Sequence, residues 1–401
     1  MKLNSCVKNG AAKKCDDFVP TLNRIFRNAR YFGITGYGLT LPFCFTLILF
    51  LMLFALEACA IWKIFKVLAG WATNASGGLM ARLSGSIFYG NALLSLLLSS
   101  RFVHSWQSLS SSWLTLETAS GLNFAPDVRI KKRTIFVTSL VATFAFVEHM
   151  LSMMSATGFD CPPEEYFEKY ILSSHGFVLQ AHEYSLWFAV PIFILSKLAT
   201  ALWNFQDLII ILISMGLTSR YHRLNLYVHH IVRIEKRFRE APKLNSYHNI
   251  INKIYTWRRL REAYVRHATL VRMVDRKLGA LVLLSNINNL YFILLQLFLG
   301  IHKDKGSAIN RGYYLLSLGW LLFRACSVVL AASDVHLHSQ RALKFLYSCP
   351  SAAYNIEVCM INNPCNDGLR IHNVTASFQS VARNTFKSDT AFKVKHFMVL
   401  N

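Results

Sequence analysis

The stretch LPFCFTLILFLMLFALEACAIW at residues 41–62 decides the fold class, and Glu57 is the only charged residue within it. A helix of this length can cross the hydrocarbon core of a bilayer, which is about 30 Å thick. Five further apolar stretches follow it, at 84–100, 134–154, 187–216, 278–301 and 313–332. The sequence therefore predicts an all-α, polytopic membrane helix bundle with six spans.

The composition of the whole chain favours the same class. Hydrophobic residues make up 53% of the 401 residues and charged residues only 16%, whereas soluble proteins carry about 25% charged residues. The net charge of +22 comes from basic residues that lie between the apolar stretches, which is typical of cytoplasmic loops. We therefore expect membrane lipid around the chain and no nucleic-acid partner. The nine cysteines form no CxxC pair or Cys/His metal spacing, so we expect no metal and no cofactor.

The basic residues also predict how the spans are oriented. Segment 218–277 holds 15 Lys or Arg residues and four acidic ones, and segments of this kind stay in the cytoplasm. Alternation then places residues 1–40 in the cytoplasm and the loops 63–83 and 155–186 outside. We expect a multi-pass plasma-membrane protein, in which Asn74 begins a sequon in the first outside loop and is a glycosylation candidate.

These assignments divide the chain into five parts. They are a cytoplasmic segment 1–40, spans one to four at 41–217, basic cytoplasmic anchor helices at 218–277, spans five and six at 278–332, and a cytoplasmic tail at 333–401.

The anchor segment has its own pattern. Tyr227, Ile231, Ile234 and Phe238 recur at helical spacing, which predicts amphipathic helices that continue from the fourth span and into the fifth. Their basic face has two interpretations, contact between subunits or contact with anionic lipid.

Polar side chains inside the spans are the candidate functional residues, because ionisable groups are costly in lipid. Glu148 and His149 lie in the predicted outer half of the third span, and Trp203, Asn204 and Asp207 lie close together in the fourth. Acidic, amide and imidazole groups beside aromatic rings suit a sugar, whose hydroxyls need hydrogen bonds and whose C–H faces pack on rings. The alternative is structural, with hydrogen bonds between helices and a buried ion pair of Asp207.

Two further spans add polar groups. Asn286, Asn289 and Gln296 recur along one predicted face of the fifth span, with Tyr291 nearby, and we expect this stripe to face inward. Arg324 lies near the middle of the sixth span, where we favour a structural or gating role. The expected ion-pair partner of Asp207 is either Arg324 or Lys197. Glu57 is expected to pair internally or to reach toward the membrane surface.

Several stretches together resemble a known family. They are SGGLMARLSGSIFY at 76–89, VEH at 147–149, WNFQDL at 203–208, NLYF at 289–292, Arg324, and YNIEV at 354–358. In their order and spacing they are similar to the sugar-sensing branch of the insect gustatory receptors. The resemblance adds Arg82 and Tyr89, which lie in the first stretch, to the pocket candidates.

The resemblance implies a function. The family consists of seven-span subunits that form ligand-gated cation channels in taste neurons. Four subunits assemble as homo- or heterotetramers, each with its own sugar pocket, and the seventh span lines the pore. In this sequence the tail from 359 to 401 has no apolar run long enough to span a bilayer. We therefore expect that the chain alone carries no sugar-gated current.

Other functions remain as alternatives. A truncated regulatory subunit without channel activity is one, and a membrane transporter is another, although the sequence has no evident inverted repeat or pair of broken helices. No group of histidines and carboxylates has a known catalytic spacing, so we expect no catalytic residues and no enzyme activity.

Overall fold

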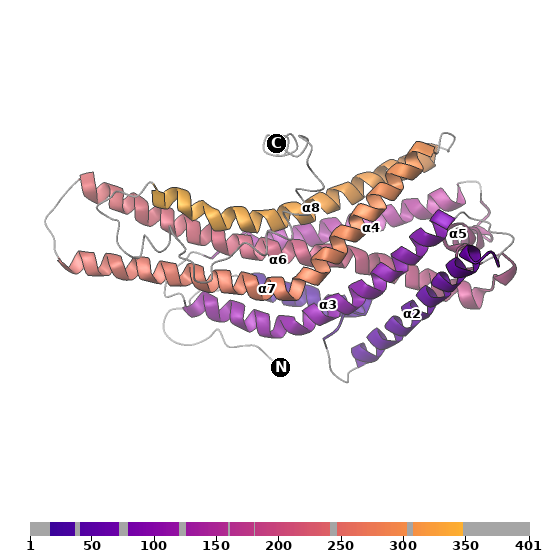
Figure 1. Ribbon diagram of the computed structural model, residues 1–401, viewed down its shortest axis with the longest axis horizontal. Helices are drawn as coiled ribbons and strands as arrows, with labels where there is room; N and C mark the ends of the chain where they lie inside the picture. The colour runs from indigo at the N-terminus through magenta and orange to yellow at the C-terminus, as the bar shows by residue number, and fades with distance from the viewer. Residues whose placement is uncertain are drawn as a thin grey trace.

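The computed structural model describes residues 17–36, 41–71, 79–119, 126–158, 161–179, 181–240, 247–302 and 308–347. All elements in these ranges are helices, and the longest of them, α6 and α7, extend along most of the bundle, whereas α2 is inclined to them (Figure 1). In chain order they are α1 Phe18–Ala29, η1 Arg30–Phe32, α2 Leu41–Leu68, α3 Leu79–Ala119, α4 Ile130–Thr157, α5 Tyr166–His175, η2 Ala181–Glu183, α6 Leu186–Glu240, α7 Tyr247–His302 and α8 Ala308–Tyr347.

The predicted all-α membrane bundle with six spans is confirmed. Six of the described helices, α2, α3, α4, α6, α7 and α8, are long and apolar enough to cross a membrane. Many of their leucine and phenylalanine side chains are exposed, for example Leu51 and Phe54 on α2. Exposed apolar residues in such number suit a lipid environment. The chain is a multi-pass membrane protein.

Several of the helices extend beyond the predicted apolar stretches. α3 continues from the span at 84–100 as far as Ala119, because Phe102, Trp106 and Trp113 bury one face of the extension against the bundle. α6 continues into the basic segment 218–277 as far as Glu240, and α7 begins within this segment at Tyr247. Tyr227 and Ile231 on α6 pack partly buried against the core. Basic side chains on the other faces therefore do not prevent burial of one stripe.

The segment 155–186 was expected to be a loop between spans, and the structure shows that this connection includes a short helix. It contains α5, which packs against α4 and α6 and buries Tyr170, Ile171 and His175. α5 has only 10 residues, so it is too short to span the membrane but can cover one end of the bundle. We call this the α5 end of the bundle; it lies on the right of Figure 1, and the opposite end is called the far end.

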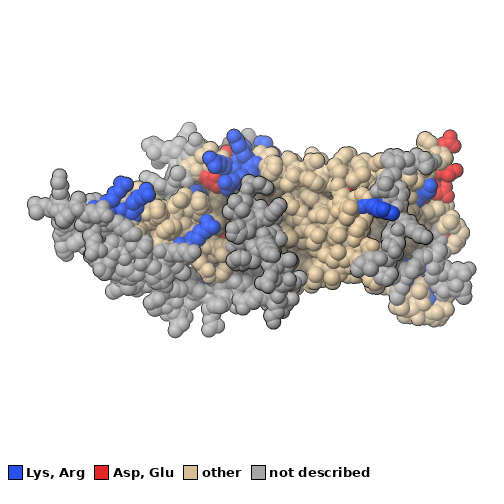
Figure 2. Space-filling view, turned by 90° about the horizontal axis from the view of Figure 1, so that it is seen from above, with Lys and Arg blue, Asp and Glu red and all other residues tan. Residues whose placement is uncertain are grey.

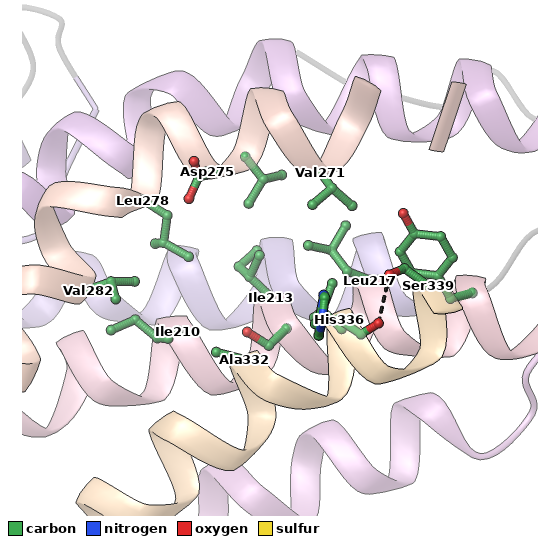
Figure 3. A pocket seen from close by; sticks show the side chains of 14 residues that line it. Ile210, Ile213, Leu217, Val271, Asp275, Leu278, Val282, Ala332, His336 and Ser339 are labelled. Carbon is green, nitrogen blue, oxygen red and sulfur yellow. Dashed lines mark hydrogen bonds between the residues drawn. The ribbon is translucent and has the colours of Figure 1, made fainter. Parts of the chain in front are cut away.

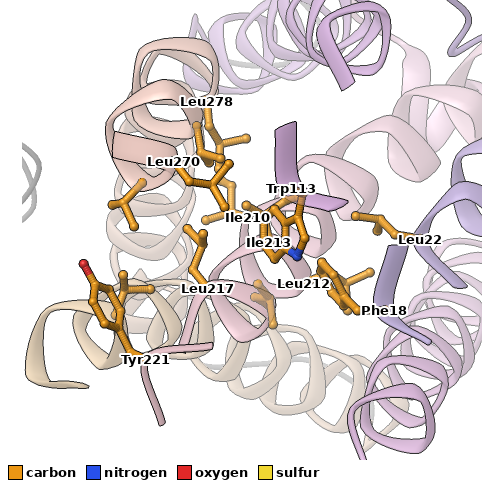
Figure 4. Packing of buried hydrophobic residues seen from close by; sticks show 14 of the residues in the cluster. Phe18, Leu22, Trp113, Ile210, Leu212, Ile213, Leu217, Tyr221, Leu270 and Leu278 are labelled. Atoms are coloured by element: carbon orange, nitrogen blue, oxygen red, sulfur yellow. The ribbon is translucent and has the colours of Figure 1, made fainter. Parts of the chain in front are cut away.

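Two hydrophobic clusters hold the bundle together. The cluster toward the far end joins α1, α3, α6, α7 and α8 through residues such as Phe18, Trp113, Ile213 and Leu270 (Figure 4). The cluster toward the α5 end includes Leu53, Tyr89, Leu96 and Leu202. Some of the predictions concern residues outside the described ranges. These residues are Asn74, the tail 359–401 and residues 1–16.

Candidate ligand-binding site

A polar cavity of about 250 Å³ lies inside the α5 end of the bundle. We call it the central cavity. α4, α5, α6, α7 and α8 all contribute to its wall, and α3 contributes Phe88. Its polar lining residues are Glu148, His149, Ser152, Tyr170, Ser174, His175, Ser196, Lys197, Thr200, Asn204, Gln296, Tyr313, Ser317 and Arg324. Its rings also include Trp203, Phe292 and Trp320.

One wall of the central cavity is a chain of hydrogen bonds that joins three helices. Gln296 Nε2 on α7 donates to Ser317 Oγ on α8 at 3.0 Å, and Ser317 Oγ donates to Glu148 Oε1 on α4 at 2.7 Å. Gln296 Oε1 is buried and has no partner among the described residues. This wall therefore offers carboxylate and amide oxygens as acceptors for a ligand.

A second wall carries positive charge. Lys197 Nζ donates to the Tyr170 hydroxyl at 2.7 Å and lies 3.2 Å from His149 Nδ1. Within the described part of the chain, no carboxylate lies within ion-pair distance of Lys197. Burial raises the pKa of Tyr170 to about 12, so its hydroxyl keeps its proton at neutral pH. The wall thus presents an ammonium group and a phenol that are held in place by each other.

Arg324 on α8 is the centre of a buried network beneath the cavity. Its Nε lies 2.7 Å from Asp207 Oδ2, and its NH1 donates to Asn204 Oδ1 at 2.7 Å. Asn289 Oδ1 accepts from Arg324 NH2 at 3.3 Å and from Trp203 Nε1 at 3.1 Å. Asp207 is 0% exposed and Arg324 3%. Charge pairing with several hydrogen bonds is what makes such burial tolerable.

A second cavity of about 600 Å³ adjoins the central cavity toward α3 and α5. The two share Phe88, Ser174, His175 and Phe292, and the second is also lined by Arg82 and Tyr89. Tyr89 OH lies 3.4 Å from His175 Nδ1. Burial, together with the charge of Lys197, lowers the pKa of His175 to about 4, so this ring is neutral at physiological pH.

A third, narrow cavity of about 60 Å³ lies toward the far end, between α6, α7 and α8 (Figure 3). Most of its lining side chains are aliphatic, such as Ile210, Ile213 and Leu278, and Ser339 Oγ donates to the backbone oxygen of His336 at 2.7 Å. Its small volume and few polar groups make it a poor site for a ligand rich in hydroxyls.

The structure brings most of the predicted site residues together. Those that line the central cavity are Glu148, His149, Trp203, Asn204, Gln296 and Arg324. Asp207 and Asn289 lie behind this lining and bind Arg324, which supports the structural interpretation of Asp207 and selects Arg324 over Lys197 as its partner. Arg82 and Tyr89 line the adjoining cavity.

Three predicted residues lie elsewhere. Asn286 donates to the backbone oxygen of Val282 on its own helix and lines none of the three cavities, and Tyr291 lines none of them either. Of the expected stripe along α7, Gln296 thus lines the central cavity and Asn286 does not. Each residue turns about 100° around a helix axis, so a step of three residues leaves Asn286 about 60° away from Asn289. Glu57 on α2 accepts a hydrogen bond from Ser86 on α3 and therefore pairs internally.

Some lining residues were not found from the sequence. Tyr170 and His175 lie on α5, in the segment that was expected to be a loop. Lys197 was considered only as a possible partner of Asp207, and Tyr313 and Ser317 were not considered. The apolar and aromatic residues clustered at 166–177 were the available signal that this segment packs into the bundle.

Sequence comparison identifies relatives of this chain. A family profile described as trehalose receptor matches residues 39–367. Gustatory receptor for sugar taste 64a of Drosophila melanogaster is 28% identical over 291 residues, which cover 68% of this chain and 59% of the relative. Gustatory receptor 5a for trehalose, also of Drosophila melanogaster, is 30% identical over 260 residues, which cover 63% of this chain and 54% of the relative. The chain thus spans less than two thirds of the length of these relatives.

Structural comparison agrees on the fold. The insect olfactory receptor OR5 from Machilis hrabei superposes with a TM-score of 0.55 at 11% identity, over 96% of this chain and 99% of the olfactory receptor. At this identity the likeness concerns the fold alone. The sequence profile covers most of the chain, including all the helices that form the central cavity, and on this ground the chain belongs to the trehalose receptor family.

Proposed function

We propose that the central cavity binds a sugar and that the chain is a subunit of a sugar-gated cation channel in the plasma membrane of taste neurons. The observation that carries the proposal is the composition of one enclosed lining, in which carboxylate, amide, hydroxyl, ammonium and guanidinium groups alternate with aromatic rings. The names of the relatives, which are receptors for sugar taste and for trehalose, support the same ligand class.

The chemistry of the lining fits a sugar in two ways. Each hydroxyl both donates and accepts, so Glu148 and Gln296 can accept from it while Lys197 donates to it. The apolar C–H face of a sugar ring packs on aromatic rings, and Trp203 and Phe292 lie beside each other with their centroids 4.8 Å apart. A ligand that lacked a hydroxyl would leave a buried polar group unpaired, which gives selectivity.

The route from binding to gating runs through Arg324 in this proposal. Arg324 lines the cavity and also holds Asp207 of α6 and Asn289 of α7, so a sugar that contacts it changes a junction of three helices. Sugar then shifts the equilibrium toward the open channel by the difference between its affinities for the two states. The proposal also includes the arrangement of the subunits. Four subunits form the channel, the amino terminus of each lies in the cytoplasm, and the anchor segment 218–277 contributes contacts between subunits.

Sugar binding to the purified chain tests the first half. We expect that sugars raise the melting temperature of the protein in detergent, and that Glu148→Gln weakens binding about tenfold, because the carboxylate is the stronger hydrogen-bond acceptor. Asn286→Ala, which alters the same bundle outside the cavity, is the matched control and should bind sugar normally. Equal affinities of E148Q and the unaltered protein for every sugar that binds would show that the site lies elsewhere.

Electrophysiology tests the second half. We expect that co-expression of this chain with a full-length relative changes the sugar-evoked current, and that Arg324→Lys alters the sugar concentration at half-maximal current. Sugar uptake without current would instead indicate a transporter. Unchanged currents and no co-purification with the relative would reject the assignment as a channel subunit.

A further inference from the structure

The exposed faces of α1 and the start of α4 form a cluster of cations beside the apolar surface of the bundle. Seven exposed residues belong to it, and we call them the basic collar: Arg24, Arg27, Arg30, Arg129, Lys131, Lys132 and Arg133. α1 packs directly against α4, so the two sets lie next to each other. We propose that the basic collar binds the headgroups of anionic phospholipids.

The position of α1 along the bundle supports this partner. Phe18 at its start packs closely against Gly216, and Phe26 contacts Phe205 with ring centroids 6.4 Å apart. These contacts cover about 16 Å of α6. They are the last turns of the apolar stretch 187–216, after which Arg220 and Arg223 begin the basic part of α6. α1 therefore lies along the last turns of this apolar stretch, and its start is level with the point where α6 becomes basic.

The two faces of α1 have separate roles. Its apolar face, with Phe18, Leu22 and Phe26, is buried in the bundle, and Trp106 Nε1 donates to Asn23 Oδ1 at 2.7 Å. Its arginines occupy the opposite face and are not needed for this packing. The packing of the apolar face therefore fixes the position of α1 on the bundle without using its arginines. The arginines remain available to an external partner.

The charge of the collar is poorly balanced by its own elements. α1 contains no acidic residue, and the first turn of α4 contains none either. Asp17 lies 3.6 Å from Lys131, and Asp127 accepts a hydrogen bond from Ser219. Burial alone would raise the pKa of Asp127, yet hydrogen bonds and nearby arginines bring it below its usual value, as expected in a positive field.

Two exposed aromatic residues lie next to the basic collar in the sequence. Tyr31 is 80% exposed and Phe32 46% exposed, directly after α1. Aromatic side chains beside a row of cations are typical of surfaces that lie in the headgroup region. Figure 2 shows the corresponding pattern on one side of the molecule, where a band with few charged side chains separates charged residues toward the two ends.

Competitive native mass spectrometry on the full chain tests the proposal. The purified protein is equilibrated in micelles with equal amounts of phosphatidylserine and phosphatidylcholine, and the bound lipids are counted. We expect a preference for phosphatidylserine that decreases with added salt, since exposed charges are screened. The variant R24Q/R27Q/R30Q should lose most of it, because each cation near a membrane surface contributes about fivefold to the affinity for anionic lipid.

Two matched variants separate the collar from charge in general. R24K/R27K/R30K keeps the positive charge and should keep the preference. R233Q/R237Q/R258Q removes three exposed arginines from the far parts of α6 and α7 and should also keep it. All variants should melt at the same temperature in phosphatidylcholine, and single Arg27→Gln replaces the triple variant if that fails to fold. The proposal is overturned if the glutamine triple retains the preference, or if the far control loses as much.

Discussion

The two ends of the bundle differ in how their interior is filled. At the α5 end, α6 places Lys197 and Asn204 in the lining of a cavity of about 250 Å³, which adjoins a second cavity of about 600 Å³. Toward the far end the same helix buries Ile209, Ile210 and the residues after them in a packed core, with a cavity of about 60 Å³. The cavities at the α5 end are larger than the cavity toward the far end, where most of the lining is aliphatic.

This difference in cavity size and packing indicates which end of the bundle can bind a ligand. Buried polar groups reduce stability unless they are fully paired, so the many polar groups in the lining of the central cavity indicate a use that depends on them. A closely packed core resists gradual deformation, so helices that share it shift together between discrete arrangements. α6, α7 and α8 pass through both halves, which makes them the elements that join the cavity to the packed end.

The largest effect is expected from the ion pair under the cavity. Arg324→Ala leaves the carboxylate of Asp207 buried and uncompensated, which should lower the free energy of unfolding by about 3–5 kcal/mol. The double variant D207L/R324M removes both charges and should be more stable than either single change, which a double-mutant cycle of melting curves measures. As a control, Arg266→Ala breaks an exposed pair with Glu262 and should cost only about 0–1 kcal/mol. Additive losses in the cycle would contradict direct coupling.

A packing change at the far end should reduce stability without changing the affinity of the folded protein for sugar. Leu260 is 0% exposed within the core of α6 and α7, and Leu260→Ala should cost about 3 kcal/mol of unfolding free energy. Leu226→Ala, at a leucine that is 55% exposed, is the matched control and should be nearly neutral. Thermal melts and sugar titrations of both variants give the comparison. A loss of affinity as large as the loss of stability would show that the two halves are not separable.

The smallest effect concerns pH at the α5 end. His175 has a folded-state pKa of about 4, below the value near 6.5 of an unfolded chain, so the unfolded state binds more protons as the pH falls. Stability should therefore be constant above about pH 7 and decrease below 6.5, so that about 2 kcal/mol is lost at pH 5. The His175→Gln variant should lack this part of the decrease in melting temperature. An identical pH profile for the variant would assign the effect to other groups.

The fold class could be predicted from the sequence because membrane spans are set by local composition. The apolar runs at 41–62 and 313–332 are recognisable without any knowledge of their neighbours. Each spanning helix must form its backbone hydrogen bonds within itself and be apolar enough for the hydrocarbon core. α5 was missed because its burial depends on contacts with α4 and α6 that its own sequence does not specify. The extension of α3 was missed for the same reason, since Trp106 and Trp113 are buried only by partners distant in the sequence.

For the site, the sequence identified polar and ionisable residues that are energetically unfavourable in lipid, but it did not identify which of them pair with each other. Glu148, His149, Asn204 and Arg324 could be selected because polar groups in apolar spans are rare. The choice of Arg324 over Lys197 as the partner of Asp207 needed the rotation and height of α8 against α6. The position of Asn286 outside the three cavities depended on the exact phase of α7, because Asn286 lies about 80° around the helix from Gln296, which lines the central cavity.

The sequence by itself determined that this chain is a membrane bundle of six recognisable spans and which of its residues are unusual in lipid, because both follow from the transfer of single side chains and single helices into hydrocarbon. Only the tertiary structure decided which of those residues share a cavity, that α5 and α8 contribute to it, and that the cations of α1 and α4 form one collar. These are relations between helices, and they depend on packing angles and side-chain directions that no single segment encodes.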